Sequence, residues 1–154
     1  MNGREWISDY STGDGLRTFW RLFRWRERTQ TGWMGDVLTF LLNRMAHRHG
    51  GYIGRGAVFA GEPVLPHGLH GVFISRYAVI GAGCRIYQNV TIGEVGHAAP
   101  EIGPGCVIGA GAVLVGKIKI GAHAKIGAGA VVCENVPDGC TVVAQRPRVL
   151  SRDP

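Results

Sequence analysis

The sequence contains few cysteines, and their spacing excludes the common metal and redox motifs. The four cysteines are Cys84, Cys106, Cys133 and Cys140. They form neither a CxxC pair nor the paired spacing of a zinc finger. Three of them lie in apolar, strand-like segments. Cysteines in such segments are typical of small buried side chains in a reducing compartment.

The sequence also lacks a long apolar run. Residues 1–10 do not show the basic-then-apolar pattern of a secretory signal. The longest apolar run near them, VLTFLL at residues 37–42, is far too short to span a bilayer. We therefore expect a cytoplasmic protein that makes no membrane contact.

Glycine and positive charge are present in excess. The chain has 25 glycines in 154 residues, about twice the usual share, and without a collagen-like triplet this abundance predicts regularly spaced tight corners. The net charge is +6, and much of the excess lies in LRTFWRLFRWRER at residues 16–28. Such a charge suits nucleic acid, anionic lipid or a phosphorylated ligand. Because no recognition motif accompanies it, we expect no nucleic-acid partner.

Aliphatic residues recur every six positions over most of the chain. The step holds within three sets: Ile53, Phe59 and Leu65; Ile74, Ile80, Ile86 and Ile92; and Ile102, Ile108, Leu114, Ile120, Ile126 and Val132. A small or apolar residue follows most of them four positions later. Neither an α-helix nor an ordinary strand has this period. The pattern predicts an all-β solenoid, a parallel β-helix of hexapeptide repeats with three short strands in each of roughly four coils.

The six-residue phase breaks twice, and histidines lie at both breaks. Three extra residues enter the step at the first break and four enter at the second. We expect two loops that leave the solenoid. The first, near residues 66–71, contains His67 and His70, and the second, near residues 93–101, contains His97. Loops on a rigid scaffold are where function is usually found.

Two helices are expected before the repeats. Residues 16–23 place apolar side chains at i, i+3, i+4 and i+7 with arginines on the other face, and a second helix runs through residues 35–51. Such a pair either caps the open end of the solenoid or lies on a membrane surface, and we expect the short N-terminal α-helical cap. The predicted domains are a helical segment at 1–50, the β-helix at 51–136 and a C-terminal tail at 137–154.

Three segments carry a resemblance to a known family: LPHGLHG, HGVFISRYAVIGAGCRIYQNVTIGE and PEIGPGCVIGAGAVLVGKIKIGAHAKIGAGAVVCENVPDG. They resemble the serine acetyltransferases and their short relatives among the hexapeptide-repeat acyltransferases, over about residues 52 to 150. The resemblance implies a left-handed β-helix and acetyl transfer from acetyl-CoA to a small-molecule hydroxyl. It also implies a homotrimer with active sites between subunits.

The resemblance implies site residues as well. The family's catalytic histidine corresponds to His67 in LPHGLHG, and its second active-site histidine corresponds to His97 in HAAPEI. Pro66 stands where the family has aspartate, and only about fifty residues precede the coil, where the family has a long helical domain. Besides L-serine as acceptor in cysteine biosynthesis, two alternatives therefore stay open: a sugar or polysaccharide O-acetyltransferase, and a non-catalytic trimeric scaffold.

Acetylation of a hydroxyl requires a base, because a hydroxyl that keeps its proton attacks a thioester poorly. Histidine is the natural base near neutral pH and needs an orienting acceptor on its other ring nitrogen. Glu62 and Glu94 are the nearest candidates in sequence for this acceptor, and we interpret His70 as a structural loop residue. A site of three histidines around a metal, as in hexapeptide-fold carbonic anhydrases, is an alternative, but we expect no metal.

Acetyl-CoA is the expected co-substrate. The two IGAGA segments lie three hexads apart, so they stack on one edge of adjacent coils and contribute small residues: Gly109, Ala110, Gly111, Ala128 and Gly129. Small corner residues allow a pantetheine arm to lie against the backbone. Lys117, Lys125 and Arg148 are candidates for the phosphates, the last through its resemblance to a C-terminal arginine of the family.

Overall fold

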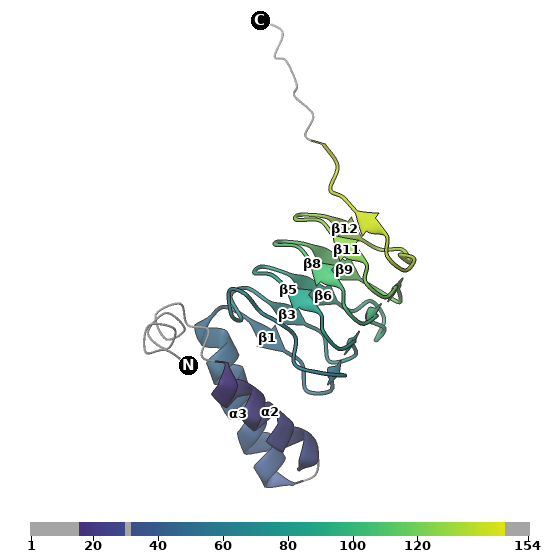
Figure 1. The fold of residues 1–154 in the computed structure, drawn as a ribbon. Helices are drawn as coiled ribbons and strands as arrows, with labels where there is room; N and C mark the ends of the chain where they lie inside the picture. Colours follow the sequence, from purple (N-terminus) through teal and green to yellow (C-terminus); the bar gives the residue numbers. More distant parts are fainter. Residues whose placement is uncertain (1–15, 30–31, 147–154) are drawn as a thin grey trace, which may run out of the picture.

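The structure, a computed structural model, describes residues 16–29 and 32–146 and is a parallel β-helix with two helices at one end (Figure 1). The helices lie at the β1 end of the stack, and β12 lies at the opposite end. The predicted phosphate ligand Arg148 falls in residues 147–154, which lie outside the described residues.

Short strands stack into three parallel sheets, one on each side of the coil. Sheet A contains, in spatial order, β1 (Tyr52–Ile53), β3 (Phe73–Ile74), β6 (Thr91–Gly93), β9 (Val113–Val115) and β12 (Val131–Val132). Sheet B contains β2 (Val58–Phe59), β4 (Val79–Ile80), β7 (Glu101–Ile102) and β10 (Lys119–Ile120). Sheet C contains β5 (Arg85–Ile86), β8 (Val107–Ile108), β11 (Lys125–Ile126) and β13 (Thr141–Val142).

Three edges run along the solenoid, because each coil passes from sheet A to sheet B to sheet C. We name each edge after the sheets that it joins. The AB edge contains the corners at 54–57, 75–78, 94–100, 116–118 and 133–135. The BC edge contains the corners at 60–63, 81–84, 103–106, 121–124 and 137–140. The CA edge contains the corners at 66–72, 87–90, 109–112 and 127–130.

The six-residue period sets the register of all three sheets. In sheet A, Ile74 pairs with Ile53 on one side and with Ile92 on the other, and the aliphatic stack continues through Leu114 to Val132. These side chains point into the coil and are at most 5% exposed. Because burial of each large aliphatic side chain contributes about 1.5–3 kcal/mol, this internal ladder is the core of the protein. The predicted hexapeptide β-helix is confirmed.

The coil continues beyond residue 136, where the sequence analysis places the start of the tail. Val136 forms a parallel bridge with Ile120, and β13 pairs with β11 in sheet C. Val136 follows Val132 by four positions instead of six, so the step between inward residues across the last AB corner is two residues shorter than a regular step. The shorter step hides the final turn from a search for a strict six-residue period.

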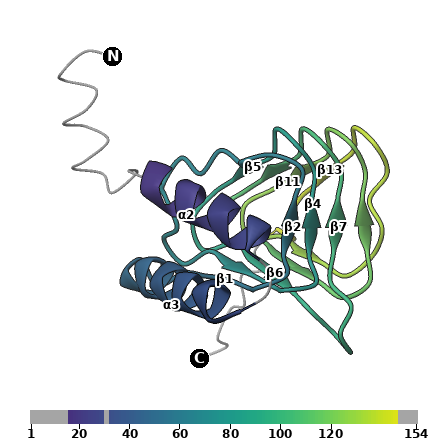
Figure 2. The same cartoon turned by 90° about the horizontal axis from the view of Figure 1, so that it is seen from below.

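The two helices close the open end of the coil at β1. α2 (Arg17–Arg28) and α3 (Trp33–Arg48) lie side by side at this end, as Figures 1 and 2 show. Trp20 and Phe23 of α2 each place a ring centroid 5.4 Å from that of Phe59, the inward residue of β2. These apolar side chains cover the end of the ladder, as a terminal cap of a solenoid must. The predicted helical cap is confirmed.

The cap helices are too short and too polar to cross a membrane, as far as residues 16–29 and 32–146 are concerned.

Candidate functional site

The CA edge aligns the loop of His67 with both IGAGA corners. Backbone hydrogen bonds join its successive corners: Asn89 N donates to His70 O (2.9 Å), Gly111 N to Gln88 O (3.0 Å) and Gly129 N to Ala110 O (2.9 Å). Since paired strands lie about 4.8 Å apart, the four corners span about 14 Å. A catalytic candidate and the small residues predicted to bind the pantetheine arm therefore share one column on the surface.

His67 lies at the first corner of this column, with its side chain exposed. Its ring contacts the ring of Tyr87, with centroids 6.1 Å apart. No hydrogen bond joins either ring nitrogen to another described residue, so both nitrogens are open to a ligand. This exposure suits a group that must take a proton from a bound molecule.

His70 lies in the same loop and forms a hydrogen bond to the loop backbone. Its Nδ1 donates a hydrogen bond to the backbone carbonyl of His67 (2.5 Å), and its Nε2 lies 3.5 Å from Nδ1 of His49, just after α3. Gly71, at φ +63°, then returns the chain to the coil and donates its N–H to His49 O. These contacts support the structural interpretation of His70 and connect the loop to the cap.

The loop at 93–101 lies on the AB edge, and it folds back onto the coil below. Nδ1 of His97 lies 3.2 Å from the hydroxyl of Tyr77, and Oε2 of Glu94 accepts a 2.5 Å hydrogen bond from the hydroxyl of Ser75. Ser75 also accepts a hydrogen bond from the backbone N–H of Tyr77. His97 is thus held near the level of the second coil, on a different edge from His67.

Glu62 is placed with the cap and not with His67. It lies on the BC edge, its carboxylate forms an ion pair with Arg24 of α2, and no hydrogen bond joins it to His67. Glu62 was predicted to orient His67 because it is close in sequence, but Glu62 lies on the BC edge and His67 on the CA edge. Glu94, the other carboxylate considered, is engaged by Ser75.

The two lysines predicted to bind the phosphates, Lys117 and Lys125, lie at different edges. Lys125 lies on β11, directly before the second IGAGA corner of the CA edge, and its side chain is exposed. Lys117 lies on the AB edge, two residues after β9. Within one chain, therefore, only Lys125 is next to the column that begins at His67.

The CA edge has features that fit an extended amide-containing ligand. Gly111 and Gly129 have φ values of +69° and +68°, which favour glycine, and a Cβ built on either would meet nothing within 4 Å. The amide oxygen of Gln88, between them and His67, is buried and has no hydrogen-bond partner among the described residues. An orphaned buried acceptor is costly unless a ligand donates to it. The N–H groups of a pantetheine arm have this chemistry.

Sequence reasoning missed four polar residues of the two edges: Ser75, Tyr77, Tyr87 and Gln88. Counting one coil onward from His67 would have found Tyr87 and Gln88 at the next CA corner. Counting one coil back from the loop at 93–101 would have found Ser75 and Tyr77. No group of three or more metal-ligating side chains gathers in the part of the chain that the structure describes.

Comparison with known proteins bears on the repeats and on the whole fold. Residues 99–134 match the family described as bacterial transferase hexapeptide (six repeats). A serine acetyltransferase of Synechococcus elongatus is 44% identical over 92 residues, covering 57% of this chain and 37% of the relative. The structure of Neisseria gonorrhoeae serine acetyltransferase in complex with serine has a TM-score of 0.73 and 35% identity, and the match covers 84% of this chain and 55% of that chain. The structure of Brucella abortus serine acetyltransferase in complex with coenzyme A also has a TM-score of 0.73, with 29% identity over 83% of this chain and 52% of that chain.

The chain thus spans about half the length of the two solved relatives. It spans 37% of the Synechococcus protein. The shared part includes the coil, and its hand is the left-handed one predicted from the resemblance. The β-helix of this chain is therefore similar to the β-helices of serine acetyltransferases, and its residues 99–134 match the hexapeptide-repeat family.

Proposed function

We propose that the protein is an acetyl-CoA-dependent O-acetyltransferase that converts L-serine to O-acetylserine. The observation that carries the proposal is the CA edge, on which an exposed histidine and two corners of small residues lie in one hydrogen-bonded column. The relatives support the substrates, because one was solved with serine and another with coenzyme A.

His67 is the proposed general base. As the serine hydroxyl attacks the thioester carbonyl, a ring nitrogen of His67 takes its proton, an O–C bond forms, and a tetrahedral oxyanion develops. The intermediate collapses as the C–S bond breaks, and the proton passes to the departing thiolate to give coenzyme A and the acetyl ester. The ring is suited to this role because it is exposed and forms no hydrogen bond with any residue that the structure describes. General-base catalysis of this kind contributes about 10²–10⁴-fold.

The acetyl-CoA arm is proposed to run along the CA edge. Its amides would meet the backbone at Gly109, Ala110 and Gly111 in one coil and at Ala128 and Gly129 in the next. In this proposal Gln88 would accept a hydrogen bond from the arm, which the missing partner of its amide oxygen supports, and Lys125 would attract the phosphates. The roughly 14 Å length of this column separates the thioester end from the nucleotide end.

A homotrimer with sites between subunits accounts for the distribution of the two histidines. The outward residues of sheet A are uncharged: Tyr52, Phe73, Thr91, Val113 and Val131. Sheets B and C instead present charges outward, including Glu101, Lys119 and Lys125. Sheet A lies between the CA and AB edges, so packing it between copies would bring His67 of one chain to the His97 edge of the next. Lys117, on the AB edge, would then approach the neighbour's CA column.

We also propose the cytoplasm as the site of action. All four cysteines are free, and two of them, Cys84 and Cys106, are buried inside the coil. Free thiols are typical of a reducing compartment.

An acetyl-transfer assay tests the proposal. The purified chain is incubated with acetyl-CoA and with L-serine, L-homoserine, glucose or galactose, and the release of the coenzyme thiol is measured. We expect turnover with L-serine that exceeds turnover with the other acceptors and with water. Turnover with a sugar alone would change the acceptor to a carbohydrate. No turnover with any acceptor, together with no binding of coenzyme A by calorimetry, would refute the enzyme and favour a scaffold.

A further inference from the structure

Arg26, in the last turn of α2, is the only charged side chain that is buried among the described residues. It is 5% exposed, and its guanidinium lies over the ring of Phe23, 4.3 Å from the centroid. No hydrogen bond or ion pair joins this guanidinium to another described residue. A largely buried charge without an acceptor is costly, because burial removes much of its water and no protein acceptor replaces it.

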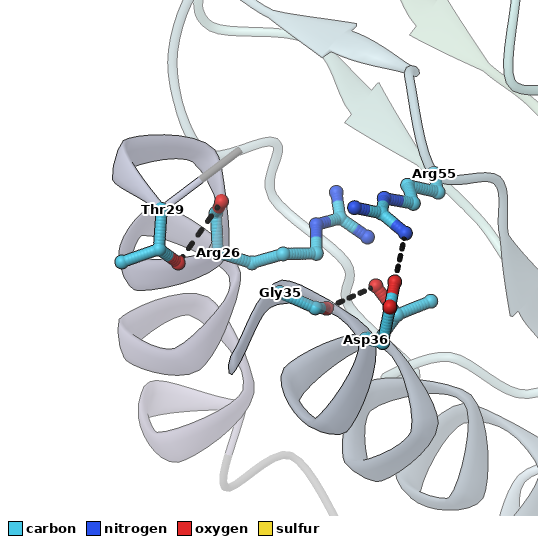
Figure 3. A network of polar contacts seen from close by, with 6 residues as sticks. Arg26, Thr29, Gly35, Asp36 and Arg55 are labelled. Atoms are coloured by element: carbon cyan, nitrogen blue, oxygen red, sulfur yellow. Dashed lines mark hydrogen bonds and ion pairs between the residues drawn. The ribbon is translucent and has the colours of Figure 1, made fainter. Parts of the chain in front are cut away.

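Arg26 lines a cavity of about 300 Å³ between the cap and the first coil. The cavity is also lined by Arg55 on the AB edge and by its neighbours Gly56, Ala57 and Val58. Figure 3 shows the guanidinium groups of Arg26 and Arg55 pointing toward each other above the start of α3. Two cations therefore converge on one small space.

The acidic groups nearby do not pair with Arg26. Asp36, in the first turn of α3, binds Nη1 of Arg55 at 2.5 Å. Glu27 lines the same cavity, but it is exposed and forms no ion pair with Arg26. Burial lowers the pKa of Arg26, and the charge of Arg55 lowers it further, while Glu27 and Tyr52 act in the opposite direction. The guanidinium of Arg26 thus lacks a close counter-charge.

The N-terminus of α3 adds to the positive potential of this region. The helix is 16 residues long, and Arg55 lies directly over its first turn, since a Cβ built on Gly35 would be 3.3 Å from Nη2 of Arg55. The first N–H groups of a helix carry a partial positive charge and bind anions. The start of α3 therefore lies beside Arg55, one of the two arginines that line the cavity.

We propose that this cavity is a binding site for a small oxyanion, a phosphate or a carboxylate, held mainly by Arg26 and Arg55. The guanidinium fork matches both groups, and the anion supplies the acceptor that Arg26 lacks. Binding would fasten the cap to the first coil, because its ligands come from α2 and from the AB edge. The site is separate from the CA column, so it does not depend on the acetyl transfer proposed above.

Thermal unfolding of the full chain tests the site. Sodium phosphate and sodium acetate are added separately, with ionic strength held constant by sodium chloride. We expect at least one of them to raise the Tm of the wild type by about 5 °C when saturating, because a ligand that binds only the folded state stabilises it. The anion that acts identifies the ligand as phosphate-like or carboxylate-like. No increase with either anion would overturn the proposal.

Three variants locate the effect. Arg26→Met should abolish the response, whereas the matched control Arg21→Met, an exposed arginine on the same helix, should respond like the wild type. Val58→Glu places a carboxylate at the rim of the cavity, so it should raise the Tm without added anion and abolish the response. If Arg26→Met does not fold, the anion response of Val58→Glu tests the site on its own. A wild-type response in either Arg26→Met or Val58→Glu would contradict the site.

Coenzyme A is added in a separate arm, because it carries phosphates of its own. A Tm increase by coenzyme A that survives in Arg26→Met belongs to the CA column and leaves the oxyanion site to be judged by phosphate and acetate. An oxyanion response without any response to coenzyme A supports the new site and counts against the proposed acetyltransferase.

Discussion

The imidazole ring of His67 lies against the phenol ring of Tyr87, with centroids 6.1 Å apart and ring planes inclined by 47°. Tyr87 belongs to the next corner of the CA edge, so this contact ties the extruded loop to the wall of the coil. His67 is thereby placed at the head of the column that leads to Gly111 and Gly129.

Replacing His67 should remove catalysis and leave coenzyme binding intact. We expect His67→Ala to lower kcat about 10²- to 10⁴-fold, the range for a lost general base. His70→Ala should lower it less, because His70 acts only through its hydrogen bond to the backbone of His67. Both variants are compared by release of coenzyme A, with calorimetric binding of coenzyme A and thermal melts as controls. A well-folded His67→Ala of normal activity would refute the assignment.

Mixing two inactive variants should restore activity if each site uses residues of two chains. His67→Ala and His97→Ala are unfolded together in equal amounts and refolded. A site is complete when one chain supplies His67 and its neighbour supplies His97, which random assembly of a closed ring gives in about a quarter of sites. Recovery near that fraction of wild-type turnover is expected. A mixture as inactive as its components would mean that the two histidines do not act in one site between chains.

A large side chain at the second IGAGA corner should block the coenzyme. Ala128 is exposed on the CA edge, and Ala82 is exposed at a comparable corner of the BC edge. We expect Ala128→Leu to raise KM for acetyl-CoA by about tenfold or more, while the matched control Ala82→Leu leaves it unchanged. Both should melt close to the wild type, because neither side chain enters the core. Equal KM values for the two variants would remove the coenzyme from this edge.

Loss of one cap side chain should destabilise the whole coil. Phe23 is 2% exposed and packs on Phe59 at the end of the ladder. Truncation of a buried phenylalanine costs about 3–5 kcal/mol. Chemical denaturation should show this decrease for Phe23→Ala and little change for Trp25→Ala, whose side chain is 47% exposed. A decrease below about 1 kcal/mol would mean that the cap contributes little to stability.

The buried thiols should make the protein sensitive to alkali. Burial raises the pKa of Cys84 and of Cys106 above the usual value near 9.0. Between the unfolded and the folded pKa the unfolded chain holds fewer protons than the folded chain, so the free energy of unfolding falls as pH rises through this range. Denaturant titrations from pH 7 to pH 10.5 should show the decrease. Ellman's reagent should modify the exposed Cys133 and Cys140 quickly, and the two buried thiols only on unfolding. Rapid modification of all four thiols in the folded protein would contradict the burial.

The coil was predictable because the same packing interaction recurs in every strand. An inward aliphatic residue in every strand forces Ile74 over Ile53 and Ile92 over Ile74, whatever lies at the corners between them. The cap was predictable for a related reason: the apolar face of α2 and the open end of the ladder both need to be covered. Only the last turn escaped, since the step across the corner before Val136 is four residues instead of six.

The site was only partly predictable, because the contacts that shape it are not periodic. The two phase breaks located His67 and His97 in loops, but nothing in the spacing shows that the second loop folds back to Tyr77 and Ser75. The partner of Glu62 depends on how α2 crosses the end of the coil, which places Arg24 beside it. Such contacts join segments that meet only after the solenoid and the cap have packed.

The hydrogen bonds from Gly111 to Gln88 and from Gly129 to Ala110 fix the spacing of successive corners on the CA edge, with one corner in each coil. Each corner lies about 4.8 Å from the next, because this is the distance between hydrogen-bonded strands. The distance from the reacting end of a ligand to its anchored end can therefore change only in whole coils. A chain that gained or lost one coil between β5 and β11 would keep its base and its corners intact, yet would measure out a carrier arm of a different length.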